Sequence, residues 1–382
     1  MTSLERVLAT VQHQQPDRIP LDLGSSFTTG ITRQAYIRLA RVLGLPDESP
    51  QLYDEVQQLA QASEPVLERL DVDVRGLIPN MVRKAPAVQE TDGVQGFTDE
   101  WGVTWKRPPG SLYFSATESR LSGPLTGKDI EAFDWPDPAA PHLFDGLADQ
   151  ARTWHEQGYA IILESLCAGM FEMGCRVRGV EQFLMDLVLE PELAQALMDK
   201  FVEIKIEFYR AAADHVGPYV QFIREGDDVA GQESMMISPQ IYQDMIKPCH
   251  RRLFEAQRRY FPEPFYVWFH TDGAITSLLP DLIDIGVDVL NPLQLTAHGM
   301  DAAKIKAEYG RDLTFWGGGV NTQQVLPHGV PDEVQRDVTQ RIQTLKPGGG
   351  FVFGTVHNIQ DDVPVENIQA MLDTLRQARS YG

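Results

Sequence analysis

The sequence has few cysteines, a shortage of basic side chains, and no long hydrophobic run. Its three cysteines, Cys167, Cys175 and Cys249, cannot form a disulfide framework across 382 residues, which favours a reducing compartment. Lysine and arginine together number 33 against 54 aspartates and glutamates, so the formal net charge is −21. That charge argues against nucleic acid or an anionic membrane surface as a partner. Because no run approaches the ~18 apolar residues of a membrane span, we expect a cytoplasmic protein.

Short β-rich runs alternate with helical stretches through most of the chain, which is the pattern of βα units around a parallel sheet. Eight such runs occur, the number of strands in a (β/α)8 barrel. They span residues 19–23, 72–79, 160–166, 219–225, 265–270, 288–293, 313–316 and 351–356. We therefore predict an α/β fold, namely a single TIM-barrel domain over residues 1–382.

One segment, residues 83–126, breaks this alternation. It contains TDGVQGFTDEWGVTWKRPPGSLYFSAT, an alternating and aromatic-rich stretch with glycine and proline at its turns. Such a pattern is typical of antiparallel hairpins. We predict a β-hairpin insertion after the second strand, with Trp101, Trp105, Tyr113 and Phe114 forming a small core of its own.

Polar side chains follow most of the predicted strands. In a (β/α)8 barrel the C-terminal strand ends meet at one face, where catalytic residues gather. Glu164 and Asp227 are candidate catalytic carboxylates there, and Asn291 and Gln294 are candidate substrate-binding amides. Asp227 and Asp228 are adjacent, and neighbouring residues on a strand point apart, so only one of the two should face the site.

His270 and Asp272 are separated by one residue at the end of the fifth predicted strand. On extended backbone both side chains point to the same side, so both can reach one metal ion. His357, after the eighth strand, is a candidate third ligand and a candidate catalytic residue. Imidazole and carboxylate ligands suit zinc or another divalent metal. The alternative is that His270 packs under a loop and Asp272 caps the following helix.

Two arginines and two glycines complete the candidate site. Arg75 and Arg224 lie on predicted strands. Each either binds a substrate carboxylate or neutralises the acidic side chains at the end of the barrel where the strands finish. Gly317 and Gly318 end the seventh strand, where they either admit a bulky ligand or supply the positive φ of a tight turn. We predict all four as substrate-binding residues.

A series of short motifs runs nearly from end to end in an order that is found in a known superfamily. The motifs are Pro16-Asp17-Arg18-Ile19-Pro20, Asp99-Glu100-Trp101-Gly102, Trp135-Pro136-Asp137-Pro138, Asp227-Asp228, His270 with Gly273, Gly317-Gly318-Gly319 and His357-Asn358-Ile359-Gln360. Through them the chain resembles the uroporphyrinogen decarboxylase (URO-D) superfamily, and more closely its branch of cobalamin-dependent methyltransferases. The resemblance implies a (β/α)8 barrel, in agreement with the eight predicted strands.

The chain departs from this superfamily in two places. Porphyrinogen decarboxylases bind acetate side chains through arginines in the loop after the first strand, but residues 22–29 here contain no arginine. The methyltransferase branch holds zinc through an H-x-C pair and a later cysteine. His270 matches that histidine, whereas Asp272 stands in place of the first cysteine and His357 lies near the second. These harder ligands suit an oxygen nucleophile or an O-methyl donor better than a thiolate.

Three functions follow from the resemblance. The first, which we favour, is metal-assisted methyl transfer or demethylation of a small substrate, with a corrinoid supplied by a partner protein. The second is a carboxy-lyase acting on a uroporphyrinogen-like or smaller pyrrolic or aromatic acid, with Arg75 or Arg224 gripping the carboxylate. The third is a non-catalytic ligand-binding barrel, which the missing cysteines suggest.

Overall fold

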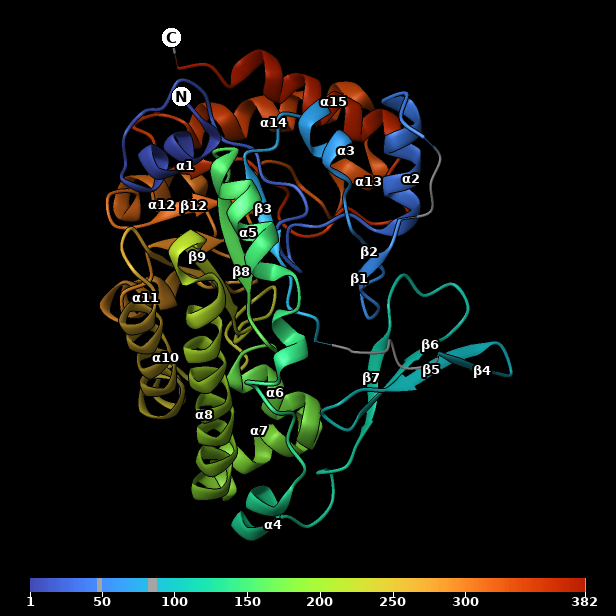
Figure 1. The fold of residues 1–382 in the computed structure, drawn as a ribbon, viewed down its shortest axis with the longest axis vertical. Helices are drawn as coiled ribbons and strands as arrows, with labels where there is room; N and C mark the ends of the chain where they lie inside the picture. The colour runs from blue at the N-terminus through green and yellow to red at the C-terminus, as the bar shows by residue number, and fades with distance from the viewer. Residues whose placement is uncertain (47–49, 82–87, 382) are drawn as a thin grey trace.

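The computed structural model describes residues 1–46, 50–81 and 88–381. Seven parallel strands form one curled sheet in chain order, with helices packed around it (Figure 1). The strands are β3 (Val74–Leu77), β8 (Ala160–Glu164), β9 (Phe222–Gly226), β10 (Tyr266–His270), β11 (Val289–Asn291), β12 (Thr314–Trp316) and β13 (Phe351–Val352). The predicted α/β barrel is therefore confirmed, with one change at its first strand.

Residues 19–23, the first predicted strand, do not form a regular ladder. They make one parallel bridge, between Leu21 and Phe353, just beyond β13. The Leu21 carbonyl also accepts a 2.9 Å hydrogen bond from the amide of Asp73, just before β3. The segment thus joins the two edges of the curled sheet. Pro20 has no amide hydrogen to donate, which limits the pairing to these isolated contacts.

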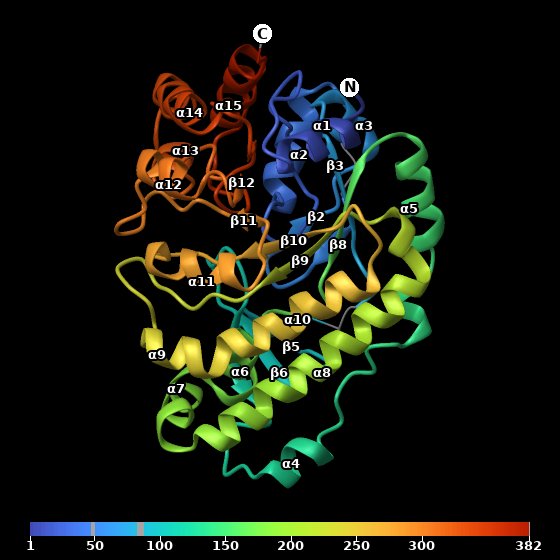
Figure 2. The same cartoon turned by 90° about the vertical axis from the view of Figure 1, so that its left-hand side faces the viewer.

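The α-helices of the described chain pack around this sheet and on one another. Helices α8 and α10 run side by side along one flank (Figure 2). The bounds of the α-helices are α1 (Ser3–Val11), α2 (Arg33–Val42), α3 (Glu64–Arg69), α4 (Gly127–Ala132), α5 (Leu147–Glu156), α6 (Met170–Arg178), α7 (Val180–Leu189), α8 (Pro191–Val216), α9 (Pro239–Ile241), α10 (Lys247–Tyr260), α11 (Leu279–Asp284), α12 (Ala302–Tyr309), α13 (Val325–His328), α14 (Pro331–Leu345) and α15 (Val365–Ala378). None of the helices in the described ranges combines the length and apolar character that crossing a membrane requires.

One end of the barrel is filled with apolar side chains. Val74, Phe222, Trp268 and Trp316, which point inward from four strands, belong to one buried cluster with Val7 of α1. Helix α1 therefore closes the end at which the strands begin. The opposite end of the barrel, where the strands finish, is the end at which barrel enzymes carry their sites.

A separate antiparallel sheet follows β3 in the chain and precedes β8. It contains β4 (Gln89–Thr91), β5 (Val94–Thr98), β6 (Val103–Arg107) and β7 (Ser115–Ser119), paired in that order. In Figure 1 it projects beside the barrel, near the short strands β1 (Leu52–Asp54) and β2 (Leu59–Ala60). Residues 83–87 of the predicted insertion lie outside the described residues, and the insertion itself stays a prediction.

Candidate active site

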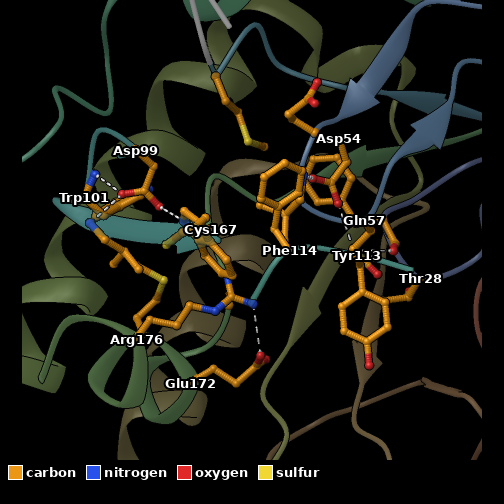
Figure 3. Close-up of a pocket in the computed structure, with 18 of the residues that line it drawn as sticks. Thr28, Asp54, Gln57, Asp99, Trp101, Tyr113, Phe114, Cys167, Glu172 and Arg176 are labelled. Carbon is orange, nitrogen blue, oxygen red and sulfur yellow. Dashed lines mark hydrogen bonds and ion pairs between the residues drawn. The ribbon is translucent and has the colours of Figure 1, made fainter. Parts of the chain in front are cut away.

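A cavity of about 570 Å³ lies between the C-terminal strand ends of the barrel and the antiparallel sheet. The barrel contributes Arg224, Asp228, His270, Asp272 and His357 to its lining. Helix α6 and the antiparallel sheet supply the opposite wall, part of which is drawn in Figure 3. The cavity therefore occupies the place where barrel enzymes carry their chemistry.

Three of the predicted metal ligands come together at the cavity. One ligand atom from each of His270, Asp272 and His357 lies within 4.8 Å of the others, and we call these three residues the metal-capable cluster. The Oδ1 atom of Asp272 is buried and has no hydrogen-bond partner among the described residues. Asp228 lies next to the cluster, with its Oδ1 3.8 Å from His270 Nε2, and this oxygen accepts a 2.8 Å hydrogen bond from the Asp272 amide. Two imidazoles and a carboxylate that converge in this way fit a divalent cation.

Asn291 fixes the orientation of the His270 ring. The two residues are paired across β10 and β11, and Asn291 Oδ1 lies 2.7 Å from His270 Nδ1. The Asn291 side-chain amide donates a 2.7 Å hydrogen bond to the Trp316 carbonyl, which turns Oδ1 toward the histidine. Nδ1 then carries the ring proton, and the Nε2 lone pair is free to bind a ligand. Asn291 is not itself a lining residue, so its position is that of a supporting group rather than the predicted substrate contact.

Asp227 and Asp228 directly follow β9, and their side chains point to different places. Asp228 lines the cavity, whereas Asp227 does not. The Asp227 carboxylate instead accepts hydrogen bonds of 3.0 and 2.9 Å from the Phe171 and Glu172 amides, at the start of α6. Its Oδ2 also lies 3.1 Å from His250 Nε2. The structure thus corrects the choice of Asp227 as the residue that faces the substrate, because its carboxylate is already used to cap a helix.

Arg75 also lies away from the cavity. Its neighbour Val74 points into the barrel, so Arg75 points outward between the sheet and the helices. There its Nε is 2.9 Å from Glu64 Oε2, and its guanidinium lies 3.7 Å from the centre of the Tyr159 ring. The predicted contact between Arg75 and substrate is therefore not supported by its position.

Glu164 is fully buried beside the cavity rather than in its lining. Its carboxylate accepts hydrogen bonds from the backbone amides of Phe27 and Ser165, at 2.8 and 3.2 Å. Burial raises the pKa of Glu164 to about 7, although the nearby Arg224 opposes this shift. Glu164 therefore holds the loop that carries Phe27 and can bind a proton near neutral pH.

The remaining predicted substrate residues hold the loops around the cavity. Gly317 and Gly318 have φ values of +93° and +85°, and a Cβ at either would lie 2.8 Å from a backbone carbonyl. These glycines allow the backbone conformation of the tight turn, and neither of them lines the cavity. Gln294 accepts a 2.7 Å hydrogen bond from the Gly273 amide and so supports the loop that follows Asp272.

Carboxyl groups outnumber cationic groups in the lining of the cavity. Among its described lining residues seven carboxylates accompany two guanidinium groups, those of Arg176 and Arg224. The carboxylates are Asp54, Glu55, Asp99, Glu100, Glu172, Asp228 and Asp272. Burial and the neighbouring Asp228 raise the pKa of Glu172 to about 7. Burial lowers the pKa of His270 to about 3, so its imidazole is neutral at physiological pH, the form that binds metals.

Sequence reasoning missed much of the cavity wall that is formed by α6 and the antiparallel sheet. Glu172 and Arg176 lie one helical turn apart on α6, 3.2 Å from each other, and Figure 3 shows this pair at the cavity. Their i, i+4 spacing directly after the third predicted strand was the available signal. The aromatic residues expected to form a core of their own also line the cavity. We call this aromatic lining the aromatic chamber: Phe27, Tyr53, Phe97, Trp101, Trp105, Tyr113 and Phe114.

Known proteins resemble this chain in sequence and in fold. The family model described as Uroporphyrinogen decarboxylase (URO-D) matches residues 115–378. The chain is 24% identical over 277 residues to "Uroporphyrinogen decarboxylase" of Psychromonas ingrahamii, covering 70% of this chain and 73% of that protein. It is 22% identical over 264 residues to "Methylated-thiol--coenzyme M methyltransferase" of Methanosarcina mazei, covering 66% and 65% respectively.

A solved structure, a methyltransferase from Methanosarcina mazei, shares the fold with a TM-score of 0.65 at 16% identity, over 99% of both chains. The family match spans well over half of the sequence and includes β8 to β13 and the metal-capable cluster. This protein therefore belongs to the uroporphyrinogen decarboxylase (URO-D) family.

Proposed function

We propose that the protein is a metal-assisted methyltransferase or demethylase, which moves a methyl group between a small substrate and a corrinoid held by a partner protein. The observation that carries this proposal is the metal-capable cluster at the cavity, in which two imidazoles and the Asp272 carboxylate converge. A relative whose name states methyltransferase activity supports it. The relative named as a decarboxylase is the reason for the alternative below.

The cluster residues suit zinc or another divalent cation. Bound there, such a cation would supply Lewis acidity toward a heteroatom of the substrate. Asn291 keeps the Nε2 atom of His270 available for this purpose. The aromatic chamber offers a surface on which an apolar substrate displaces water, and it thereby positions the reacting group near the cluster. The corrinoid carrier would have to dock over the open end of the barrel, because the other end is filled.

The excess of carboxyl groups in the cavity favours this proposal over decarboxylation of a porphyrinogen. A substrate with many acetate and propionate groups needs several cationic partners, but seven carboxylates line this cavity against two guanidinium groups. Residues 22–29 contain no arginine that could bind such a substrate. A decarboxylase of a small acid is the second candidate. It is favoured by Arg224, whose Nε atom has no hydrogen-bond partner among the described residues.

Two measurements test the proposal. Elemental analysis should find about one divalent cation per chain, and His270→Ala should remove it. The protein is then mixed with methylated phenols or methylamines and a cob(I)alamin source, and methylcobalamin is followed by its absorption spectrum. Arg75→Gln is the matched control, because Arg75 is a buried strand residue outside the cavity. Failure to form methylcobalamin from any donor, with release of carbon dioxide from a pyrrole or aromatic acid, would favour the decarboxylase.

A further inference from the structure

Arg224 is a buried guanidinium whose hydrogen-bonding capacity is largely unused. The residue is 7% exposed and lines the cavity. Its Nε atom has no hydrogen-bond partner in the described parts of the chain. Its Nη1 atom lies 3.5 Å from Glu164 Oε1, longer than the roughly 2.8 Å of a charge-assisted hydrogen bond. Although burial opposes the shift, the carboxyl groups of Glu164, Glu172, Glu225 and Asp228 compensate the charge of this cation and raise its pKa. The unpartnered Nε donor remains costly unless a ligand rearranges the site to satisfy it.

The position of this guanidinium is set by a glycine. A Cβ at Gly226 would lie 3.2 Å from Arg224 Cζ and 3.0 Å from the Cβ of His270. The guanidinium therefore folds over Gly226 and lies next to the histidine. An oxyanion bound to Arg224 would consequently sit beside the metal-capable cluster.

The second guanidinium of the cavity is already occupied. Arg176 lies 3.2 Å from Glu172 and its guanidinium lies 5.6 Å from the centre of the Trp105 ring. Arg224 is therefore the lining guanidinium that has an unpartnered donor, and the carboxyl groups elsewhere in the lining disfavour a ligand with a second anionic group. The rest of the lining is rich in flat aromatic rings, including Phe27 and Tyr53, which stack with their centres 5.6 Å apart.

We propose that the cavity binds a planar aromatic monocarboxylate, with the carboxylate on Arg224 and the ring in the aromatic chamber. A guanidinium and a carboxylate pair through two parallel hydrogen bonds, and the ligand would meet the part of the Arg224 guanidinium that lines the cavity. The inference deepens the proposed function, because such a compound would be the methyl donor or acceptor of that reaction. Binding itself requires neither the metal nor the corrinoid.

The test is isothermal titration of the full chain in EDTA, so that no metal contributes. Benzoate is the probe, and benzamide, of nearly the same shape but uncharged, is the control. Quenching of tryptophan fluorescence gives a second readout, because Trp101 and Trp105 line the cavity. We expect benzoate to bind at least about tenfold more tightly than benzamide, since a hydrogen-bonded charge is worth about 1.5–3 kcal/mol. Isophthalate should bind more weakly than benzoate because its second carboxylate meets the acidic wall.

Variants of the two predicted arginines complete the test. Arg224→Gln should reduce benzoate affinity at least about tenfold while benzamide still binds, which also shows that the cavity is folded. Arg75→Gln should leave benzoate affinity unchanged, since Arg75 does not reach the cavity. Equal affinity for benzoate and benzamide, or unchanged benzoate affinity in Arg224→Gln, would overturn the inference. Methyl transfer is assayed separately, so either proposal can fail while the other stands.

Discussion

Replacement of Asn291 by alanine should weaken metal binding although it removes no metal ligand. The Asn291 side chain is completely buried and is in contact with both His270 Nδ1 and the Trp316 carbonyl, each at 2.7 Å. Without it the histidine can change tautomer or rotate, and its Nε2 atom no longer faces the cavity reliably. Loss of such a supporting contact typically costs roughly 10- to 100-fold in metal affinity.

The same change should also destabilise the fold. It leaves the His270 ring N–H and the Trp316 carbonyl buried without partners, and each unsatisfied group costs about 1–3 kcal/mol. Asn367→Ala is the matched control, because Asn367 is a buried amide that donates to the Leu326 and Gly329 carbonyls on the outer side of the barrel. The control should lose similar stability in urea unfolding but keep its metal affinity.

Competition with a chelating dye measures the zinc affinity of the wild-type protein and both variants at pH 7.5. We expect weaker binding in Asn291→Ala alone, with the ion still bound in near-stoichiometric amount at saturation. Wild-type affinity in this variant would refute the reasoning that the Asn291 contact selects the ligand form of His270. An equal loss in Asn367→Ala would point to general destabilisation as the cause.

Three further predictions follow from single contacts. His270→Ala should abolish stoichiometric zinc in elemental analysis, and a full complement of zinc in that variant would place the metal elsewhere. Burial raises the pKa of Glu164 from 4.5 to about 7, so the folded state favours the protonated carboxyl group. The free energy of unfolding should therefore fall as the pH rises from about 4.5 to 7. In Glu164→Gln, the free energy of unfolding measured in urea should change less with pH over this range. An unchanged pH dependence would show that other groups cause it. Gly174→Ala should lower stability by about 1–3 kcal/mol, because its Cβ would lie 2.3 Å from the Phe183 ring, while Gly127→Ala, with open space around it, should not.

The strand pattern predicted the barrel well because a buried parallel sheet requires short apolar runs at regular spacing. The same pattern could have resolved the choice between Asp227 and Asp228. If Arg224 points into the barrel end, then Asp228, four residues later, points the same way, and Asp227 points outward. Choosing Arg224 together with Asp227 combined residues on opposite faces of one strand. The parity argument also places Arg75 outside, since its neighbour Val74 is an inward residue.

The sequence by itself determined the class of fold, the end of the barrel that carries the site and the side chains able to hold a metal. These features depend on local periodicity and on the rule that parallel strands finish at one face. Only the tertiary structure brought the aromatic chamber and the Glu172–Arg176 pair against that face, because packing between the antiparallel sheet, α6 and the barrel is a contact between distant segments. It also left the Nε atom of Arg224, beside the cavity, without a hydrogen-bond partner among the described residues, since pairing depends on which carboxylates fold within reach of it.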